Sequence, residues 1–340
     1  MMPFISRVES NNVSLRIILW FIAFAILLLA PEARANKPER LIFIDTSAHL
    51  HGVLPMGRSD FEGAAREALR AMDEAGISRT ILLPPPFTYN HRSLYDEETL
   101  RPIAKKYPDR FCFMAGGGSL SPMLIEAAKS REVSASLKKS FAETARKIAD
   151  SGAVGFGEIA LDHFGLGPNH NYEYVPPDHP LMLMLADIAA ERGIPIFVHL
   201  EAIEQEAPIA DQYADFGNPK ILKPNIKAFE RLLAHNRKTS FVWAQLGWDH
   251  TGQRTPHLME RLFTTHSNLF AAVKIGPDSL PENNPLSRGQ GLRPEWMQLF
   301  KKFPDRIMLG GDQFYAAPGA NERFLQRLLP LRSLIGRTAR

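Results

Sequence analysis

Two histidines stand close together near the start of the chain, directly behind a short apolar run. His49 and His51 close the stretch Asp-Thr-Ser-Ala-His-Leu-His, which follows Leu-Ile-Phe-Ile at residues 41–44. Alternate residues of an extended segment point the same way, so the two imidazoles can face one metal ion from the end of a buried strand. Two ordinary loop histidines would show the same spacing, so the metal prediction depends on other residues.

Three more residues of the ligand type follow apolar, strand-like runs later in the chain: Glu158, His199 and Asp312. Each has an ordinary alternative, because a glutamate can pair with a cation, a histidine can be satisfied in a core and an aspartate can cap a turn. Imidazole nitrogens and carboxylate oxygens suit Zn²⁺, Mn²⁺ or Fe²⁺. We therefore predict that these three residues, with His49 and His51, form a divalent metal site whose first choice is Zn²⁺.

Short apolar runs alternate with stretches of helical periodicity from residue 41 onward. Strands are predicted at 41–46, 79–84, 110–115, 153–158, 195–199, 240–244, 269–274 and 306–310. Helices are predicted between and after them, near 61–75, 96–107, 133–150, 178–192, 221–236, 255–266, 293–302 and 319–330. Strands rich in Ile, Val, Leu and Phe with helices between them indicate a parallel sheet whose outer face is covered.

Eight strand–helix units predict an α/β fold, namely a closed (β/α)8 TIM barrel in a single domain. An open doubly wound sheet is the alternative, although no glycine-rich phosphate-binding turn follows the first strand. In a barrel of this kind, side chains at the C-terminal ends of the strands meet at one face. The candidate ligands all fall at such ends, so we expect them to form one site.

The first 35 residues predict a secretory signal peptide. Basic residues precede the uncharged apolar run 17–30, and Ala33-Arg34-Ala35 offers small residues at the two positions that a signal peptidase reads. An uncleaved anchor is the alternative, although the run is short for a membrane helix of ~20 residues. We expect residues 36–340 to form the mature domain, exported to the periplasm or secreted and without stable membrane association.

Composition and charge point to a small-molecule partner. The formal net charge is +3 at pH 7 and no basic run occurs, so nothing predicts nucleic-acid binding.

Cys112 is the only cysteine and lies in an apolar run. No internal disulfide is therefore expected, and metal binding must use nitrogen and oxygen ligands. A homo-oligomer is compatible with the sequence, which leaves the oligomeric state open.

Three segments give the chain a resemblance to the amidohydrolase superfamily, in its broad amidohydrolase-related branch, across nearly all of residues 41–315. They are Asp-Thr-Ser-Ala-His-Leu-His at 45–51, Val-His-Leu-Glu at 198–201 and Gly-Gly-Asp-Gln-Phe at 310–314. The resemblance implies that His49 and His51 are the His-x-His pair of the family. It likewise implies that His199 is the strand-five histidine, and that Asp312 is the strand-eight aspartate that serves as metal ligand and proton shuttle.

A shorter segment, Gly-Glu-Ile-Ala-Leu-Asp at 157–162, resembles the strand-four segment of the metal-dependent deoxyribonuclease branch and implies that Glu158 is a bridging ligand. Gln245 is a departure, because the family commonly ends strand six on a histidine. A glutamine amide donates and accepts hydrogen bonds but takes no proton near neutral pH, and it is a weak zinc ligand. We expect Gln245 to bind substrate or a metal-bound water.

Three cations are candidate anchors for an anionic substrate. Lys274 ends the seventh predicted strand in an apolar context, where a buried cation needs an anion. That anion can be Glu158, Asp312 or a substrate carboxylate. Arg254 and Arg288 can do the same from loops.

The resemblance implies a metal-dependent hydrolase that uses metal-activated water on a small amide, lactone or ester. Asp312 would take the proton from that water, with Gln245 or Lys274 near the developing oxyanion. Two alternatives remain open at this point. One is a non-oxidative decarboxylase on the same metal site, and the other is a metal-containing binding protein without turnover.

Overall fold

The computed structural model separates a unit of residues 1–40 from a unit of residues 41–340, and it describes residues 42–167, 170–275, 279–287 and 291–320. The predicted signal peptide and Arg288 lie outside the described residues, as does nearly all of the predicted helix near 319–330. No helix within the described ranges is both long and apolar enough to cross a membrane.

The second unit is built around a closed ring of parallel strands. Its order is β1 (Phe43–His51), β2 (Ile77–Leu82), β3 (Phe111–Phe113) with β4 (Ala115–Gly116), β5 (Phe156–His163), β7 (Ile196–Leu200), β10 (Phe241–Leu246), β11 (Leu269–Val273), and β14 (Ile307–Leu309) with β15 (Gln313–Ala316). β3 and β4 are two pieces of the third strand, and β14 and β15 are two pieces of the eighth. Because β14 pairs with β11 and β15 pairs with β1, the ring closes. The predicted (β/α)8 barrel is confirmed.

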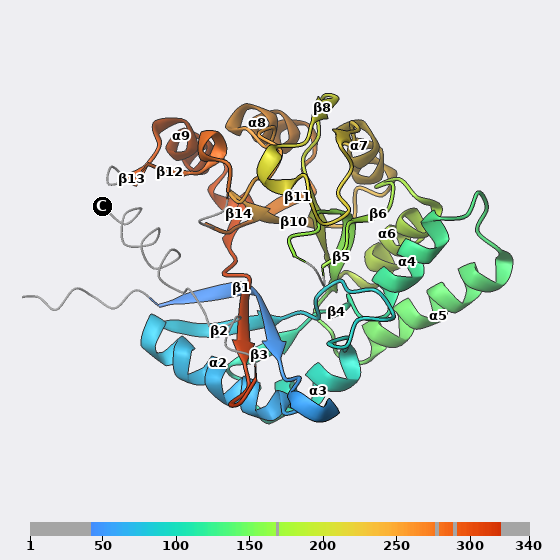
Figure 1. The fold of residues 1–340 in the computed structure, drawn as a ribbon, viewed down its shortest axis with the longest axis vertical. Coiled ribbons are helices and arrows are strands. Elements are labelled where there is room, and N and C mark those ends of the chain that lie inside the picture. The colour runs from blue at the N-terminus through green and yellow to red at the C-terminus, as the bar shows by residue number, and fades with distance from the viewer. Residues whose placement is uncertain (1–41, 168–169, 276–278, 288–290, 321–340) are drawn as a thin grey trace, which may run out of the picture. The chain divides into compact units, whose positions relative to one another are not determined.

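Helices lie on the outside of the strands (Figure 1). They are α2 (Phe61–Ala75), α3 (Glu97–Lys106), α4 (Leu120–Ala128), α5 (Ala135–Asp150), α6 (Pro180–Arg192), α7 (Ile226–His235), α8 (Pro256–Thr265) and α9 (Pro294–Lys302). In α2, the Asp60 carboxylate caps the first turn by accepting the Gly63 amide at 2.6 Å, and Gly76 ends the helix at a φ of 84°. Burial of Ala64, Ala68 and Met72 packs its apolar stripe against the barrel.

Shorter elements occupy the connections. They are the two-residue strands β6 (Glu173–Tyr174), β8 (Ala207–Pro208), β9 (Ile221–Leu222), β12 (Leu286–Ser287) and β13 (Gly291–Leu292), and the 3-10 turns η1 (Pro55–Gly57), η2 (Asp211–Tyr213), η3 (Pro281–Asn283) and η4 (Pro304–Arg306). Of these, β6 pairs antiparallel with the end of β5 and places Glu173 opposite His163.

The apolar core has two layers. A large cluster fills the space between the strands and the helices, and a smaller one comes from the opposite face of the strands, inside the barrel. The inner cluster consists of Leu83, Met114, Phe197, Val242, Ala244 and Ala272. These residues fill the interior of the barrel below the loops. Polar side chains at the C-terminal ends of the strands therefore lie above a close-packed apolar layer.

The structure corrects several predicted boundaries. β1 continues to His51 and β5 to His163, each several residues past the predicted end, so the two histidines of the first motif lie within a strand. The segment predicted as a helix at 221–236 begins with β9, and its helix starts at Ile226. α4 was not predicted, because its residues are buried on more than one face and show no polar stripe.

Candidate metal centre

The inward face of β1 carries a row of polar residues. Ala48 and Leu50 pack in the outer core, so by strand alternation His49 and His51 face the barrel interior. Both are buried. Asp45 is also buried, but a register shift between Asp45 and Ala48 separates it from this alternation. The predicted direction of the two histidine side chains therefore agrees with the alternation of β1.

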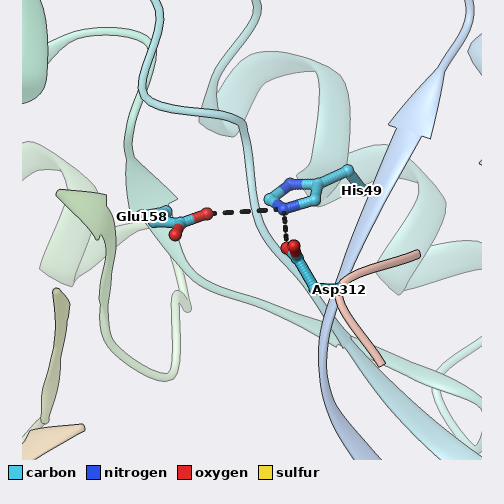
Figure 2. Close-up of side chains that lie close together, drawn as sticks. All are labelled: His49, Glu158 and Asp312. Carbon is cyan, nitrogen blue, oxygen red and sulfur yellow. Dashed lines mark hydrogen bonds and ion pairs between the residues drawn. The ribbon is translucent and has the colours of Figure 1, made fainter. Parts of the chain in front are cut away.

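His49 of β1, Glu158 of β5 and Asp312, which lies between β14 and β15, come together as Figure 2 shows. Nε2 of His49 lies 2.9 Å from Oδ1 of Asp312 and 3.4 Å from Oε2 of Glu158. One possible ligand atom from each residue lies within 4.8 Å of the other two. Among the described residues this is the group of nitrogen and oxygen donors that can hold a metal ion.

A hydrogen bond from Nδ1 to the backbone of Leu83 fixes the orientation of the His49 ring. Its Nδ1 lies 2.8 Å from the backbone oxygen of Leu83, a contact that requires a proton on Nδ1. In a neutral imidazole, Nε2 then turns a lone pair toward the two carboxylates. Lone pair and carboxylates repel unless a proton or a metal cation lies between them. With a metal cation, this is the arrangement of a metal-binding histidine whose other nitrogen donates to a backbone oxygen.

Because the site is buried, water does not screen its carboxylates, and a positive charge between them is strongly stabilising. The side chains of His49 and Glu158 are 1% and 3% exposed. Burial alone lowers the pKa of His49, but hydrogen bonds to Asp312 and Glu158 raise it to about 10. Burial raises the pKa of Glu158, yet the neighbouring His199 and His49 outweigh that effect and hold it well below the usual range. The donor set thus fits a divalent cation such as Zn²⁺, Mn²⁺ or Fe²⁺.

Asp312 is held from its other side by two donors. Nε2 of Gln245 lies 2.9 Å from Oδ2 of Asp312, and Nζ of Lys274 lies 2.5 Å from the same oxygen. The Lys274 ammonium also lies 3.2 Å from the centre of the Trp248 ring. Burial would raise the pKa of Asp312, but Lys274 and His49 lower it, so the group is a carboxylate. Oδ1 therefore remains to face His49.

Unusual backbone geometry brings both Gln245 and Asp312 into the site. In a regular strand Gln245 would share a face with Trp243, which packs outward against Phe229 of α7. Instead the pairing of β10 with β11 shifts register between Trp243 and Leu246, and Gln245 has a φ of 64°. Asp312 has a φ of 49°. Non-glycine residues in this region are strained, and such strain is concentrated at functional sites.

His199 touches the group through Glu158. Its Nδ1 lies 3.1 Å from Oε1 of Glu158, and its Nε2 lies 3.4 Å from Oε1 of Glu201. His250 in turn places Nδ1 2.8 Å from the same Glu201 oxygen. Glu201 was not among the predicted site residues, although its position two residues after His199 on a strand end was the available signal.

The other predicted residues lie apart from the three-residue group. His51 is buried at the end of β1 but is not a member of that group. Arg254 is also buried and lies over the Trp243 ring at 4.0 Å, on the helix-facing side of β10. Metal binding by His51 and His199 and substrate binding by Arg254 stay predictions.

No protein-family description matches the chain. No curated protein matches it either.

The fold is similar to solved structures over most of the chain. The probable 2-pyrone-4,6-dicarboxylic acid hydrolase of Acinetobacter baumannii is 15% identical with a TM-score of 0.41, over 87% of this chain and 91% of that one. Dihydroorotase from Campylobacter jejuni is 16% identical with a TM-score of 0.44, over 86% and 77%. A manganese-containing dihydroxybenzoic acid decarboxylase from Polaromonas is 15% identical with a TM-score of 0.43, over 87% and 94%.

Proteins named as amidohydrolases are also among the similar structures. All of these are proteins that the chain resembles. At this level of identity and TM-score, no reaction, substrate or residue role passes from them to this chain. The chemistry of the site is therefore argued from its own residues.

Proposed function

We propose that the chain is a metal-dependent hydrolase of the amidohydrolase type, acting on a small amide, lactone or ester. The observation that carries the proposal is the convergence of His49 Nε2 with carboxylate oxygens of Glu158 and Asp312 at the C-terminal end of the barrel. A divalent ion held there would act as a Lewis acid on the substrate carbonyl and make water easier to deprotonate.

The protein's own groups then have distinct roles. Asp312 offers Oδ1 as the proton acceptor, while Gln245 and Lys274 hold Oδ2 and fix the plane of the carboxylate. Leu83 fixes the ring of His49 through its backbone oxygen. Because these groups are buried and already in place, little reorganisation is needed when a proton moves to Asp312.

Lys274 favours an anionic substrate. A divalent ion together with the Lys274 ammonium carries one positive charge more than the carboxylates of Glu158 and Asp312. The ammonium has three hydrogens and, among the described residues, one carboxylate acceptor in Asp312, and its side chain remains 17% exposed. We propose that a substrate carboxylate binds to its remaining hydrogens.

Non-oxidative decarboxylation is the second candidate. The observation that favours it is the 2.5 Å contact between Lys274 and Asp312, because a proton shared by this pair could be delivered to a carbanionic carbon. Both reactions use the same metal centre. A protein that binds the ion without turnover is the remaining alternative.

One experiment separates these proposals. Purified protein is analysed for metal, supplied with Zn²⁺ or Mn²⁺, and assayed on lactones, amides and esters with and without a carboxylate, beside aromatic carboxylic acids with CO₂ release monitored. Metal-dependent hydrolysis supports the first proposal and metal-dependent CO₂ release the second. A metal-loaded protein that is silent on both panels supports binding alone, and a protein that retains no metal contradicts all three.

A further inference from the structure

A buried carboxylate of β1 holds the turn that carries Asp312. Oδ1 of Asp45 accepts the backbone N–H of Gly311 at 2.7 Å and that of Ser47 at 3.2 Å. Asp45 is 0% exposed. The Gly311 amide immediately precedes Asp312, so this hydrogen bond acts one peptide away from the carboxylate of the metal centre.

Two further contacts join the same segments. The Thr46 hydroxyl donates to the backbone oxygen of Leu309 at 2.7 Å, and the Asp312 amide donates to the backbone oxygen of Ser47 at 2.7 Å. Residues 45–47 therefore bind residues 309–312 at three points. Within this turn Asp312 has a φ of 49°, a conformation that surrounding contacts must impose on a non-glycine residue.

The fit between Asp45 and Gly311 leaves no spare room. A Cβ atom on Gly311 would lie 2.9 Å from Oδ2 of Asp45, so the carboxyl group lies directly against the glycine backbone. Oδ2 of Asp45 has no hydrogen-bond partner among the described residues, and burial raises the pKa of this carboxyl to about 7. A buried acid with one unsatisfied oxygen is costly, and an apolar residue here would avoid that cost.

We propose that Asp45 is a positioning residue, which sets the Asp312 carboxylate at the metal centre by holding the Gly311 amide. Asp45 itself contacts none of the three donor atoms of the centre. Its effect passes through the backbone, from the Gly311 amide to the left-handed residue that follows. The role toward metal rests on the proposed function, whereas the hold on the turn can be tested without any metal.

Three variants test the proposal. Asp45→Ala removes the acceptor, and Asp45→Asn keeps an oxygen that can accept the Gly311 amide. Asp96→Ala is the matched control, because Asp96 is also buried, also accepts a glycine amide at 2.7 Å, and also has its pKa raised by burial, to about 6. Its partner Gly116 lies on β4, away from strand eight. Because Gly116 pairs with Gly157, next to Glu158, this variant is a control for the exchange of strand eight and not for metal affinity.

Two measurements are made on each variant. The first is amide hydrogen exchange of residues 307–316 in metal-free protein, and the second is Mn²⁺ affinity by calorimetry. We expect Asp45→Ala to speed exchange in that segment and to weaken Mn²⁺ binding by about 10- to 100-fold, the usual loss when a residue that orients a metal ligand is removed. Asp45→Asn should remain within a few-fold of the parent in both measurements, and Asp96→Ala should leave exchange in residues 307–316 unchanged.

The outcomes are separable. Unchanged exchange of residues 307–316 in Asp45→Ala, or equally faster exchange of that segment in Asp45→Ala and Asp96→Ala, would overturn the positioning role. Faster exchange with unchanged Mn²⁺ affinity would also overturn the positioning role. Asp45 would then hold the turn, but its hold would not affect metal binding. A parent protein that binds no Mn²⁺, Zn²⁺ or Fe²⁺ would instead contradict the proposed function, and the exchange comparison would still decide whether Asp45 holds the turn.

Discussion

Oδ1 of Asp312 lies 2.9 Å from Nε2 of His49, although 263 residues separate the two in the chain. The pairing of β15 with β1 makes them neighbours, because it sets His49 opposite Phe314 across the seam that closes the barrel. The geometry of the metal centre therefore depends on closure of the ring. A substitution in β1 that disturbs its pairing with β15 should displace Asp312, and one in β15 should displace His49.

Asp312→Asn keeps the size and polarity of the side chain but removes its ability to accept a proton. We expect turnover of a substrate found in the panels above to fall by ~10²-fold or more, the usual worth of a positioned acid–base group. Metal affinity should fall only modestly, because the amide oxygen can still coordinate. Steady-state kinetics and calorimetry measure the two effects. Asp305→Asn, on the exposed η4 turn, is the control, and turnover in Asp312→Asn within a few-fold of the parent would contradict the role.

The two histidines of the first motif should differ. His49→Ala removes the nitrogen that faces both carboxylates and should abolish metal retention, since it removes one of the three donors and the only nitrogen among them. His51→Ala removes a neighbour on the same face of β1 that is outside the three-residue group, and we expect a smaller loss. Elemental analysis after dialysis measures both, and thermal unfolding checks that both variants fold. Equal loss in the two variants would favour the original pairing of His49 with His51 on one ion.

Much of the fold could be predicted because its signals are local. The range of α2 follows from a capping aspartate, an apolar stripe and a terminal glycine, all present in the sequence. The barrel follows from repeated apolar runs. The ends of β1 and β5 were predicted too early, because a polar residue interrupts each apolar run, at Ser47 in β1 and at Glu158 in β5. Beyond these positions the strands continue, and apolar residues such as Leu50 and Ile159 are buried in the outer core.

The site was only partly predictable for a related reason. His49, Glu158 and Asp312 were found because residue type and strand end coincide. The contact of Gln245 with Asp312 depends on a register shift in β10 and on a positive φ at Gln245. Neither can be predicted from the local sequence pattern. The role of Asp45 was likewise hidden, because it acts through a turn that is 266 residues away.

Lys274→Met tests whether the cation selects the substrate. The variant keeps an unbranched side chain against Trp248 but removes the charge. We expect KM for a carboxylate-bearing substrate to rise by about 10-fold or more, since a charged hydrogen bond contributes ~1.5–3 kcal/mol. Mn²⁺ affinity should stay equal or increase, because a like charge beside the ion has been removed. Lys301→Met on the exposed face of α9 is the control. A KM that changes equally for neutral and anionic substrates would count against a role in selection.

Export is a separate proposal. We expect the mature protein to begin at residue 36, because the apolar run 17–30 and the Ala33-x-Ala35 site occur together. Intact-mass measurement and N-terminal sequencing of protein recovered from its natural compartment test this. Replacing Ala33 and Ala35 with bulky residues should leave the precursor uncleaved. An intact N-terminus in the membrane fraction of the unmodified protein would mean an anchor.

The last prediction concerns the pH dependence of stability in metal-free protein. Glu173 is 7% exposed, and among the described residues His163 can pair with it, with Nδ1 3.9 Å from Oε2. Burial raises the pKa of Glu173 from 4.5 to about 8, against weaker lowering by His199 and Lys129. Burial also lowers the pKa of His163, to about 3, so this imidazole is neutral and cannot balance the carboxylate. The folded protein therefore keeps a proton on Glu173 that the unfolded chain has lost.

The sign of the effect follows from proton counts. Below pH 4.5 both states are protonated and Glu173 contributes no penalty. Between pH 4.5 and about 8 the folded state binds more protons, so the free energy of unfolding falls as pH rises, by at most about 1.4 kcal/mol for each pH unit. Glu173→Gln removes this titration. Urea unfolding at several pH values should show the stability of the variant gaining on that of the parent throughout this window and levelling above about pH 8, whereas Glu143→Gln on the exposed face of α5 should follow the parent. A constant difference between Glu173→Gln and the parent would show that Glu173 is ionised when folded and that a cation balances it.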